Sequence, residues 1–275
     1  PKPFTDGSGR LDLARAIADP KNPLTARVLV NRVWMQHFGT GLVATPSNFG
    51  LRGEAPSHPE LLDYLAARFI EDGWSLKKLH RLIVTSRAYQ LSSAENAKSR
   101  SVDPDNRLYA RANRRRLDFE TLRDSLLAVA GNLDLKMGGP SVDITKAPWS
   151  ARRTLYGFID RQNLPGMFRT FDFASPDTST PVRYQTTVPQ QALFLLNHPF
   201  VQEQTRTLLK RPELGVDAPA EKIRRLYRVI YARDPDVEEV RLGEQFLALA
   251  GTGGMSPWER YAQALLIANE FAFVD

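Results

Sequence analysis

One stretch near the N-terminus mixes apolar side chains with polar ones that could do chemistry. On a helical wheel of residues 24–38, Asn31 lies in the middle of an apolar stripe, and much of the rest of the helix is apolar too. A buried polar group without a partner costs about 1–3 kcal/mol. Asn31, Arg32, Gln36 and His37 therefore need partners, which could be the fold itself or a ligand.

A second stretch, "TVPQQALFLLNHPF" at residues 187–200, is of the same kind. Its apolar helix residues accompany the amides of Gln190, Gln191 and Asn197. Amides beside an apolar face commonly brace neighbouring backbone, and they are also what a neutral, hydroxyl-rich ligand needs. The sequence leaves both interpretations open.

The chain has four histidines, His37, His58, His80 and His198. Their spacing matches none of the local patterns that hold a metal, such as HxxxH, HxH or HExxH. We therefore expect no metal site from a local motif and no cofactor in this chain. A helix C-terminus suits His37 as a cation, and His80 is typical of a satisfied core histidine.

The carboxylates of the central loop give a weaker signal for a catalytic site. Asp172 and Asp177 lie near Arg169 and Arg183 in sequence, which could give a glycosidase-like pair of carboxylates. The simpler interpretation is that aspartates and arginines brace a long loop.

Helices should position most of these residues. Capping signals at Ser57, with Glu60 three residues on, and at Ser75 predict helices that end near residues 72 and 89. A third capping signal, at Ser256 before Pro257, opens the last helix. The expected helices span residues 11–18, 24–38, 58–72, 76–89, 106–113, 119–130, 189–197, 200–210, 220–232, 237–250 and 257–271.

The remaining segments read as irregular or extended. Residues 39–56, 92–105, 131–151 and 160–188 are rich in Gly, Pro or polar residues and are expected as loops. Residues 152–159 alternate like a strand and are the best β candidate. We therefore predict a mainly α fold, a single helical domain with long irregular central loops and one small β-hairpin around residues 152–159.

The composition is that of an ordinary soluble globular protein. Of 275 residues, 42% are hydrophobic and 25% charged, and no apolar run approaches the roughly 20 residues that span a bilayer. The chain begins with Pro1, so we expect a piece excised from a larger protein. A finer division would place lobes at residues 1–130 and 189–275, joined by the loop-rich residues 131–188.

The numbers of cysteines and arginines limit which covalent, metal and anion-binding sites this chain can contain. The absence of cysteine excludes disulfides, thiolate metal sites and CxxCH haem attachment within this chain. The net charge is +6, built from 28 Arg and 9 Lys. Because the planar guanidinium suits paired contacts with anions, this bias favours internal ion pairs first and an anion-binding surface second. Nucleic acid comes last, since there is no long basic run or recognised motif.

Five segments together resemble a known family. They are "NPLTARVLVNRVWMQHFGTGLVATPSNFG", "PSHPELLDYLAARFIEDGWSLKKLHRLIVTSRAYQLSS", "NRRRLDFETLRDSLLAVAGNLDLKMGGPSV", "TVPQQALFLLNHPFV" and "ALLIANEFAFVD". They look like a planctomycete-specific domain of unknown function, domain of unknown function 1553, and cover nearly the whole chain in order.

The resemblance implies a setting rather than an activity. Such domains close large exported proteins, after a second domain of unknown function and often a cytochrome-c-like domain, so it implies an extracytoplasmic parent with haem in its other domains. Proteins with such domains are often encoded beside sulfatase-like proteins, so the resemblance suggests a role in polysaccharide metabolism. No catalytic residue carries over. The family's recurring polar positions match Asn31, Arg32, His37, Asn48, His58, His80, Arg81, Arg115, Glu120, Arg123, Arg183, Gln190, Gln191 and Asn197.

These observations lead to one site hypothesis and several functional ones. We expect Asn31, Arg32, His37, His80, Arg81, Gln190 and Gln191 to form a buried or cleft-lining network, with His58, Arg183 and Asn197 as further candidates. The preferred function is an accessory domain that binds glycan or packs against upstream domains of the same parent. The alternative is a catalytic domain that acts on polysaccharide, including sulfated polysaccharide, with a carboxylate and a histidine.

Overall fold

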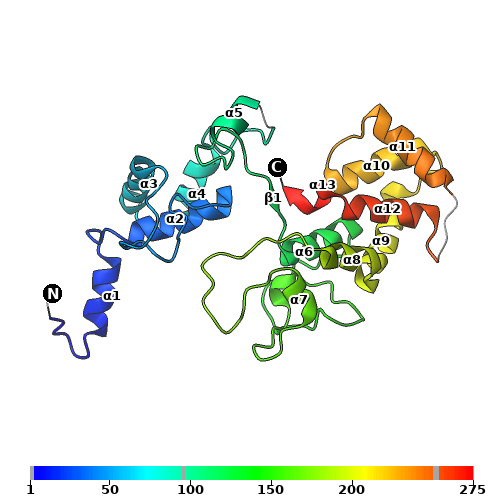
Figure 1. Ribbon diagram of the computed structural model, residues 1–275. Coiled ribbons are helices and arrows are strands. Elements are labelled where there is room, and N and C mark those ends of the chain that lie inside the picture. The colour runs from blue at the N-terminus through cyan, green and yellow to red at the C-terminus, as the bar shows by residue number, and fades with distance from the viewer. Residues whose placement is uncertain (1–2, 95–96, 250–253, 275) are drawn as a thin grey trace. The chain divides into compact units, whose positions relative to one another are not determined.

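The computed structural model describes residues 3–94, 97–249 and 254–274 (Figure 1). The contacts between residues divide the chain into two compact units. Unit 1 ends at Arg115 and unit 2 begins at Arg116, so the boundary lies within the short strand β1 (Arg115–Arg116). Each unit has a hydrophobic core of its own.

Unit 1 is built on three helices that contact one another, α2, α3 and α4. Its core includes Val30 and Trp34 of α2, Leu65 and Phe69 of α3, and Ile83 of α4. The helix α1 has no buried residue. The bounds are α1 (Arg10–Ala18), α2 (Thr25–Phe38), α3 (Pro59–Glu71), α4 (Leu76–Val84) and α5 (Ala97–Val102).

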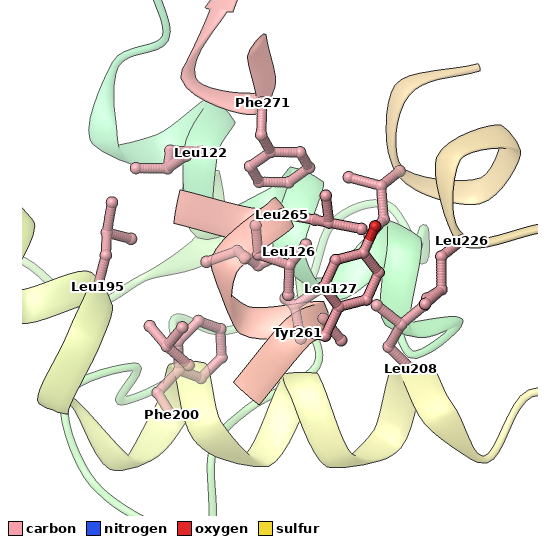
Figure 2. Close-up of a cluster of buried hydrophobic side chains, with 14 of the residues drawn as sticks. Leu122, Leu126, Leu127, Leu195, Phe200, Leu208, Leu226, Tyr261, Leu265 and Phe271 are labelled. Carbon is pink, nitrogen blue, oxygen red and sulfur yellow. The ribbon is translucent and has the colours of Figure 1, made fainter. Parts of the chain in front are cut away.

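Unit 2 contains the remaining helices and the short strand β2 (Phe273–Val274), which pairs with β1. Helices α6, α9 and α12 supply the centre of its core, where Leu126, Phe200 and Leu265 meet (Figure 2). The bounds are α6 (Phe119–Ala130), α7 (Gly166–Thr170), α8 (Pro189–Asn197), α9 (Pro199–Leu209), α10 (Pro219–Tyr231), α11 (Val237–Ala248), α12 (Pro257–Ile267) and α13 (Asn269–Ala272), with 3₁₀ turns at Thr154–Tyr156 and Pro212–Leu214.

Helix α11 can approach its neighbours closely because residue 243 is a glycine. A Cβ atom added at Gly243 would lie 2.6 Å from the hydroxyl of Tyr261 and 2.9 Å from Ile223. Both distances are shorter than atoms of folded proteins tolerate, so any larger residue would force α11 away from α10 and α12.

The mainly α fold class is confirmed, with thirteen α-helices in the described residues. Several ends follow the predicted signals. Ser75 accepts a hydrogen bond from the Lys78 N–H, Ser256 forms a capping box with Glu259, and Gly131 ends α6 in the left-handed conformation. Two segments expected as loops contain the short helices α5 and α7. The predicted end of one helix at residue 250 lies outside the described residues.

The capping box expected at Ser57 was wrong. The N–H of Ser57 donates to the carbonyl of Leu42 at 2.8 Å, and its hydroxyl also reaches that oxygen. Ser57 is thus tied to the loop before α3, and His58 becomes the N-cap residue, without a side-chain cap. Helix α4 also ends earlier than expected, at Val84, where the hydroxyls of Thr85 and Ser86 bond to carbonyls of its last turn.

The helix predicted at residues 106–113 does not form. Asn106 and Tyr109 adopt left-handed backbone angles, with φ of 51° and 53°. The amide of Asn106 donates to the carbonyl of Arg111 and to the side chain of Asn113. These local hydrogen bonds compete with a helix for the same backbone.

The β-hairpin expected around residues 152–159 is also corrected. The two strands of the described sheet are β1 and β2, whereas residues 152–159 contain a 3₁₀ turn between two isolated bridges. Side chains of α6 satisfy the backbone here: Arg123 donates to the carbonyls of Ser150 and Arg152, and Asp124 accepts from the Thr154 N–H. The alternating pattern therefore reflects packing against a helix.

Candidate functional site

Asn31 is fully buried and is used by the fold. Its Oδ1 accepts a hydrogen bond from the Val43 N–H at 2.8 Å, and its Nδ2 donates to the Val43 carbonyl at 3.0 Å. A Cβ atom at Gly41 would lie 2.7 Å from the same amide nitrogen, so only glycine fits there. Asn31 therefore holds the loop after α2 against the helix.

The structure brings His37 and His80 together on the surface of unit 1. The Nε2 of His37 and the Nδ1 of His80 are 2.8 Å apart and share a hydrogen bond, and the ring of Tyr89 stands edge-on to His37. Burial lowers the pKa of His37 below its ordinary value, and the nearby His80 and Arg115 lower it further. The shared hydrogen bond therefore joins α2 to α4.

The other candidates of unit 1 lie apart from Asn31. Arg32 and Arg81 are exposed. His58 contacts the hydroxyl of Ser57 at 3.0 Å. Asn48 bonds within its own loop, to the Gly50 N–H.

The hydrogen bond between Trp34 and Tyr109 was not predicted from the sequence. The Trp34 Nε1–H donates to the Tyr109 hydroxyl at 2.8 Å, across 75 residues of chain, and both rings lie against Phe38. Burial raises the pKa of Tyr109. No spacing in the sequence signals this contact, because Trp34 and Tyr109 are 75 residues apart and the local pattern around Tyr109 predicts a helix.

In unit 2, Gln191 is a buried brace. The Arg116 guanidinium donates to its Oε1, and its Nε2 donates to the Thr170 carbonyl at 2.8 Å. Gln263 acts in the same way, donating to the last carbonyls of α8 at Leu195 and Leu196. The buried amides of Asn31, Gln191 and Gln263 therefore all bond to groups of the fold.

Gln190 and Asn197 behave differently. Both are exposed, and neither side chain has a hydrogen-bond partner among the described residues. They stand seven residues apart on α8, with Phe194 between them, and so share one helix face. They line an open groove of about 550 Å³ with Met167, Thr170, Leu193, Phe194, His198 and Pro199.

His198 completes this groove. Its ring stacks on Phe194 with centroids 4.3 Å apart, and Trp149 lies on another side at 5.2 Å. Its Nδ1 accepts from the Phe200 N–H at the start of α9, and burial lowers its pKa. A neutral ring that accepts at Nδ1 carries its proton on Nε2, so His198 can donate there. Sequence reasoning noted His198 but did not place it with the two amides.

A second cavity of about 520 Å³ lies along α6 and contains two carboxylates, Glu120 and Asp124. Both are already held. Arg183 donates to both oxygens of Glu120, at 2.6 and 2.8 Å, and stacks on Phe173. Asp124 accepts from the backbone and hydroxyl of Thr154 at 2.7 Å.

The loop carboxylates brace the chain as well. Asp172 accepts from the N–H and hydroxyl of Thr186, and Asp177 lies 3.8 Å from Arg161. Two arginines of this loop form ion pairs, Arg161 with Asp177 and Arg183 with Glu120, which is the use that the bias over lysine favours.

Metal binding and membrane insertion are two wider classes of function that side chains and helices can indicate. Within the described residues, no group of three or more His, Asp or Glu side chains gathers as a metal site would require. In the same residues, no helix combines the length and the apolar character that crossing a bilayer demands.

Comparison with known families gives one match. The model of the family described as PSD1, protein of unknown function (DUF1553), matches residues 9–247. The chain belongs to this family. Comparisons with curated proteins and with solved structures find no match.

The DUF1553 match covers every candidate discussed above, from Asn31 to His198. It stops within α11, yet α12 and α13 beyond it supply Tyr261, Leu265 and Phe271 to the core of unit 2. The folded unit of this DUF1553 protein therefore extends past the matched residues. Gln190 and Asn197, with His198, form the group best suited to an outside ligand.

Proposed function

We propose that this chain is an accessory binding domain of an exported, multidomain parent, and that its groove on α8 recognises neutral, hydroxyl-rich stretches of polysaccharide. The carrying observation is that Gln190 and Asn197 are exposed two turns apart on one face of α8, without hydrogen-bond partners in the described part of the chain, next to a neutral imidazole. The same proposal places the parent protein outside the cytoplasm and includes cytochrome-associated domains upstream of this chain in the parent.

The groove has the mixture of surfaces that a sugar requires. Each amide offers both donors and an acceptor, and His198 adds a donor, so hydroxyl groups of either role can be satisfied. Leu193 and Phe194 give an apolar surface for the C–H face of a sugar ring. The groove has no charged side chain among its lining residues, which favours a neutral ligand over an anionic one.

The catalytic alternative is favoured by one observation, the pair of carboxylates one turn apart in the cavity on α6. Their occupied oxygens weigh against it, since an acid–base group must be free to exchange protons with substrate. A carboxylate and a histidine do not occur together in either of the two cavities. Binding therefore suits the geometry better than catalysis.

Glycan-array binding tests the proposal. The wild-type chain should bind a subset of neutral oligosaccharides, and the double variant Q190A/N197A should lose that binding. The matched control Q245A/N163A removes one glutamine and one asparagine that are also exposed in unit 2, outside the groove, and should bind as wild type does. Equal binding by all three chains, or no binding to any neutral glycan, would refute a glycan groove on α8.

A further inference from the structure

The positive charge of this chain is concentrated in one unit. Residues 1–115 contain 18 Lys and Arg against 11 Asp and Glu, whereas residues 116–275 contain 19 against 20. The whole net charge of +6 therefore comes from unit 1. Its helices α2 and α4 contain no acidic residue at all. Such an imbalance attracts anions to one part of the surface.

The charges of α4 gather around the histidine pair. Lys77, His80 and Arg81 are exposed, and their spacing of three and four residues puts them on one face of the helix. His37 joins this face through its hydrogen bond to His80, and Arg115 acts electrostatically on His37. We refer to these five residues, Lys77, His80, Arg81, His37 and Arg115, as the α4 basic surface.

Of the three Lys and Arg residues of this surface, Arg115 is used by the fold, since it donates to the carbonyl of Gln36. Lys78 turns to Asp72, with its Nζ 3.2 Å from a carboxylate oxygen, but Lys77 and Arg81 have no carboxylate partner among the described residues. Two imidazole nitrogens 2.8 Å apart could suggest a metal site. The surrounding positive field opposes a metal cation, however, and attracts an anion.

We propose that the α4 basic surface binds an acidic polysaccharide through its carboxylate groups. The exposed ring of Tyr89, which stands beside His37, offers a flat apolar face next to the cations, as a sugar acid requires. Duplex nucleic acid is disfavoured, because tight binding to it generally uses about 6–10 phosphate contacts and this surface has far fewer cations. This site is separate from the groove on α8, and only its preference for glycan over other polyanions rests on the proposed function.

The histidine pair gives this interaction a pH signature. The groups that face His37 are His80 on α4, Arg115 on β1 and the ring of Tyr89. While the two imidazoles share one hydrogen bond, one of them must be neutral, and acid adds charge to the surface. Uronate carboxylates stay ionised above about pH 5, so binding should strengthen as the pH falls from about 7.5 to 5.5.

Titration of the whole chain with polygalacturonate tests the site, with neutral dextran, poly-glutamate and single-stranded oligo-dT as competing probes. Wild type should bind polygalacturonate most tightly, and K77E/R81E should weaken it by about tenfold or more at low salt. The control K210E/R224E changes the same charges on exposed residues of unit 2 and should keep wild-type affinity. Equal losses in both double variants would overturn the site, and tighter binding of oligo-dT or poly-glutamate would overturn its ligand.

A second pair of variants checks the histidines and separates this inference from the groove. The variant H37Q/H80Q should bind at neutral pH but lose the strengthening in acid, and an unchanged pH profile would contradict the role given to the pair. Q190A/N197A should leave polygalacturonate binding intact. Loss of binding in Q190A/N197A but not in K77E/R81E would assign the acidic glycan to the groove and refute the α4 basic surface.

Discussion

Two helices of this protein, α2 in unit 1 and α8 in unit 2, carry amides beside an apolar face. In α2 the amide of Asn31 is hydrogen-bonded to the N–H and the carbonyl of Val43 and is buried. In α8 one amide, Gln191, is bonded to the fold in the same manner, but Gln190 and Asn197 line an open groove and have no hydrogen-bond partner in the described residues. The same residue types thus serve the fold in one helix and are free for a ligand in the other.

The difference lies in what covers each helix. A loop of unit 1 closes over Asn31, and its backbone offers the donor and acceptor that an amide matches. On α8 the side chains of Gln190 and Asn197 are exposed, whereas Leu195 is buried in the core of unit 2. Burial and partners, rather than residue type, therefore distinguish a structural amide from a binding one.

The largest effect should come from removing the buried amide of unit 1. Asn31→Ala leaves the N–H and the carbonyl of Val43 without partners in the interior, so the free energy of unfolding should fall by about 2–4 kcal/mol. Urea denaturation followed by tryptophan fluorescence measures it. Gln36→Ala on the exposed side of the same helix serves as the control and should change stability by less than about 0.5 kcal/mol. An effect of Asn31→Ala no larger than that of Gln36→Ala would contradict the structural role given to Asn31.

Adjacent residues of α8 sharpen the comparison. Gln191→Ala removes the acceptor of Arg116 and the donor to Thr170, and should cost about 1–3 kcal/mol of folding free energy. Gln190→Ala, one position earlier, should cost no more than about 0.5 kcal/mol. Thermal denaturation of the two single variants compares them directly, and similar losses would show that the exposed amide is structural too.

The carboxylate of Glu120 gives a moderate effect. Glu120→Gln breaks its ion pair with Arg183, which is only partly shielded from solvent, and should cost about 1 kcal/mol. Because we assign Glu120 to bracing, binding of neutral glycan at the groove should persist. If wild type hydrolysed a polysaccharide and Glu120→Gln abolished that activity, the catalytic alternative would replace the binding one.

The smallest effect concerns pH. The pKa of His198 in the folded chain is below that of a solvated histidine, so the unfolded chain binds more protons between the two values. Stability due to neutral His198 is present above the unfolded pKa of about 6.5 and is lost as the pH falls below it. The melting temperature of wild type should drop in acid, and His198→Gln should flatten part of that drop. Parallel curves for the two chains would contradict this assignment.

Local signals predicted the helices well where capping residues acted on their own neighbours. Ser75, Gly131 and the Ser256 box set helix ends as expected. Prediction failed where a distant partner competed, as Leu42 did for Ser57 and as α6 did for the backbone of residues 150–154. Such partners are brought together only by the fold.

The candidate site residues show the same difference between local signals and distant partners. Gln190 and Asn197 could be grouped from the sequence, because a spacing of seven residues on one helix is a local property. The contact of His37 with His80 spans 43 residues, and that of Glu120 with Arg183 spans 63. The network expected from Asn31 to Gln191 involves residues of both units and stays a prediction. Within each unit, the structure shows these two amides bonded to their own surroundings.

Calorimetric titration of the Q190A/N197A chain, with the neutral oligosaccharide that wild type binds best, is the most direct test that the free amides of α8 form a binding site. The account predicts that affinity falls by about tenfold to a hundredfold, the equivalent of two or more lost hydrogen bonds, while the melting temperature stays that of wild type. Wild-type affinity in the double variant would contradict it.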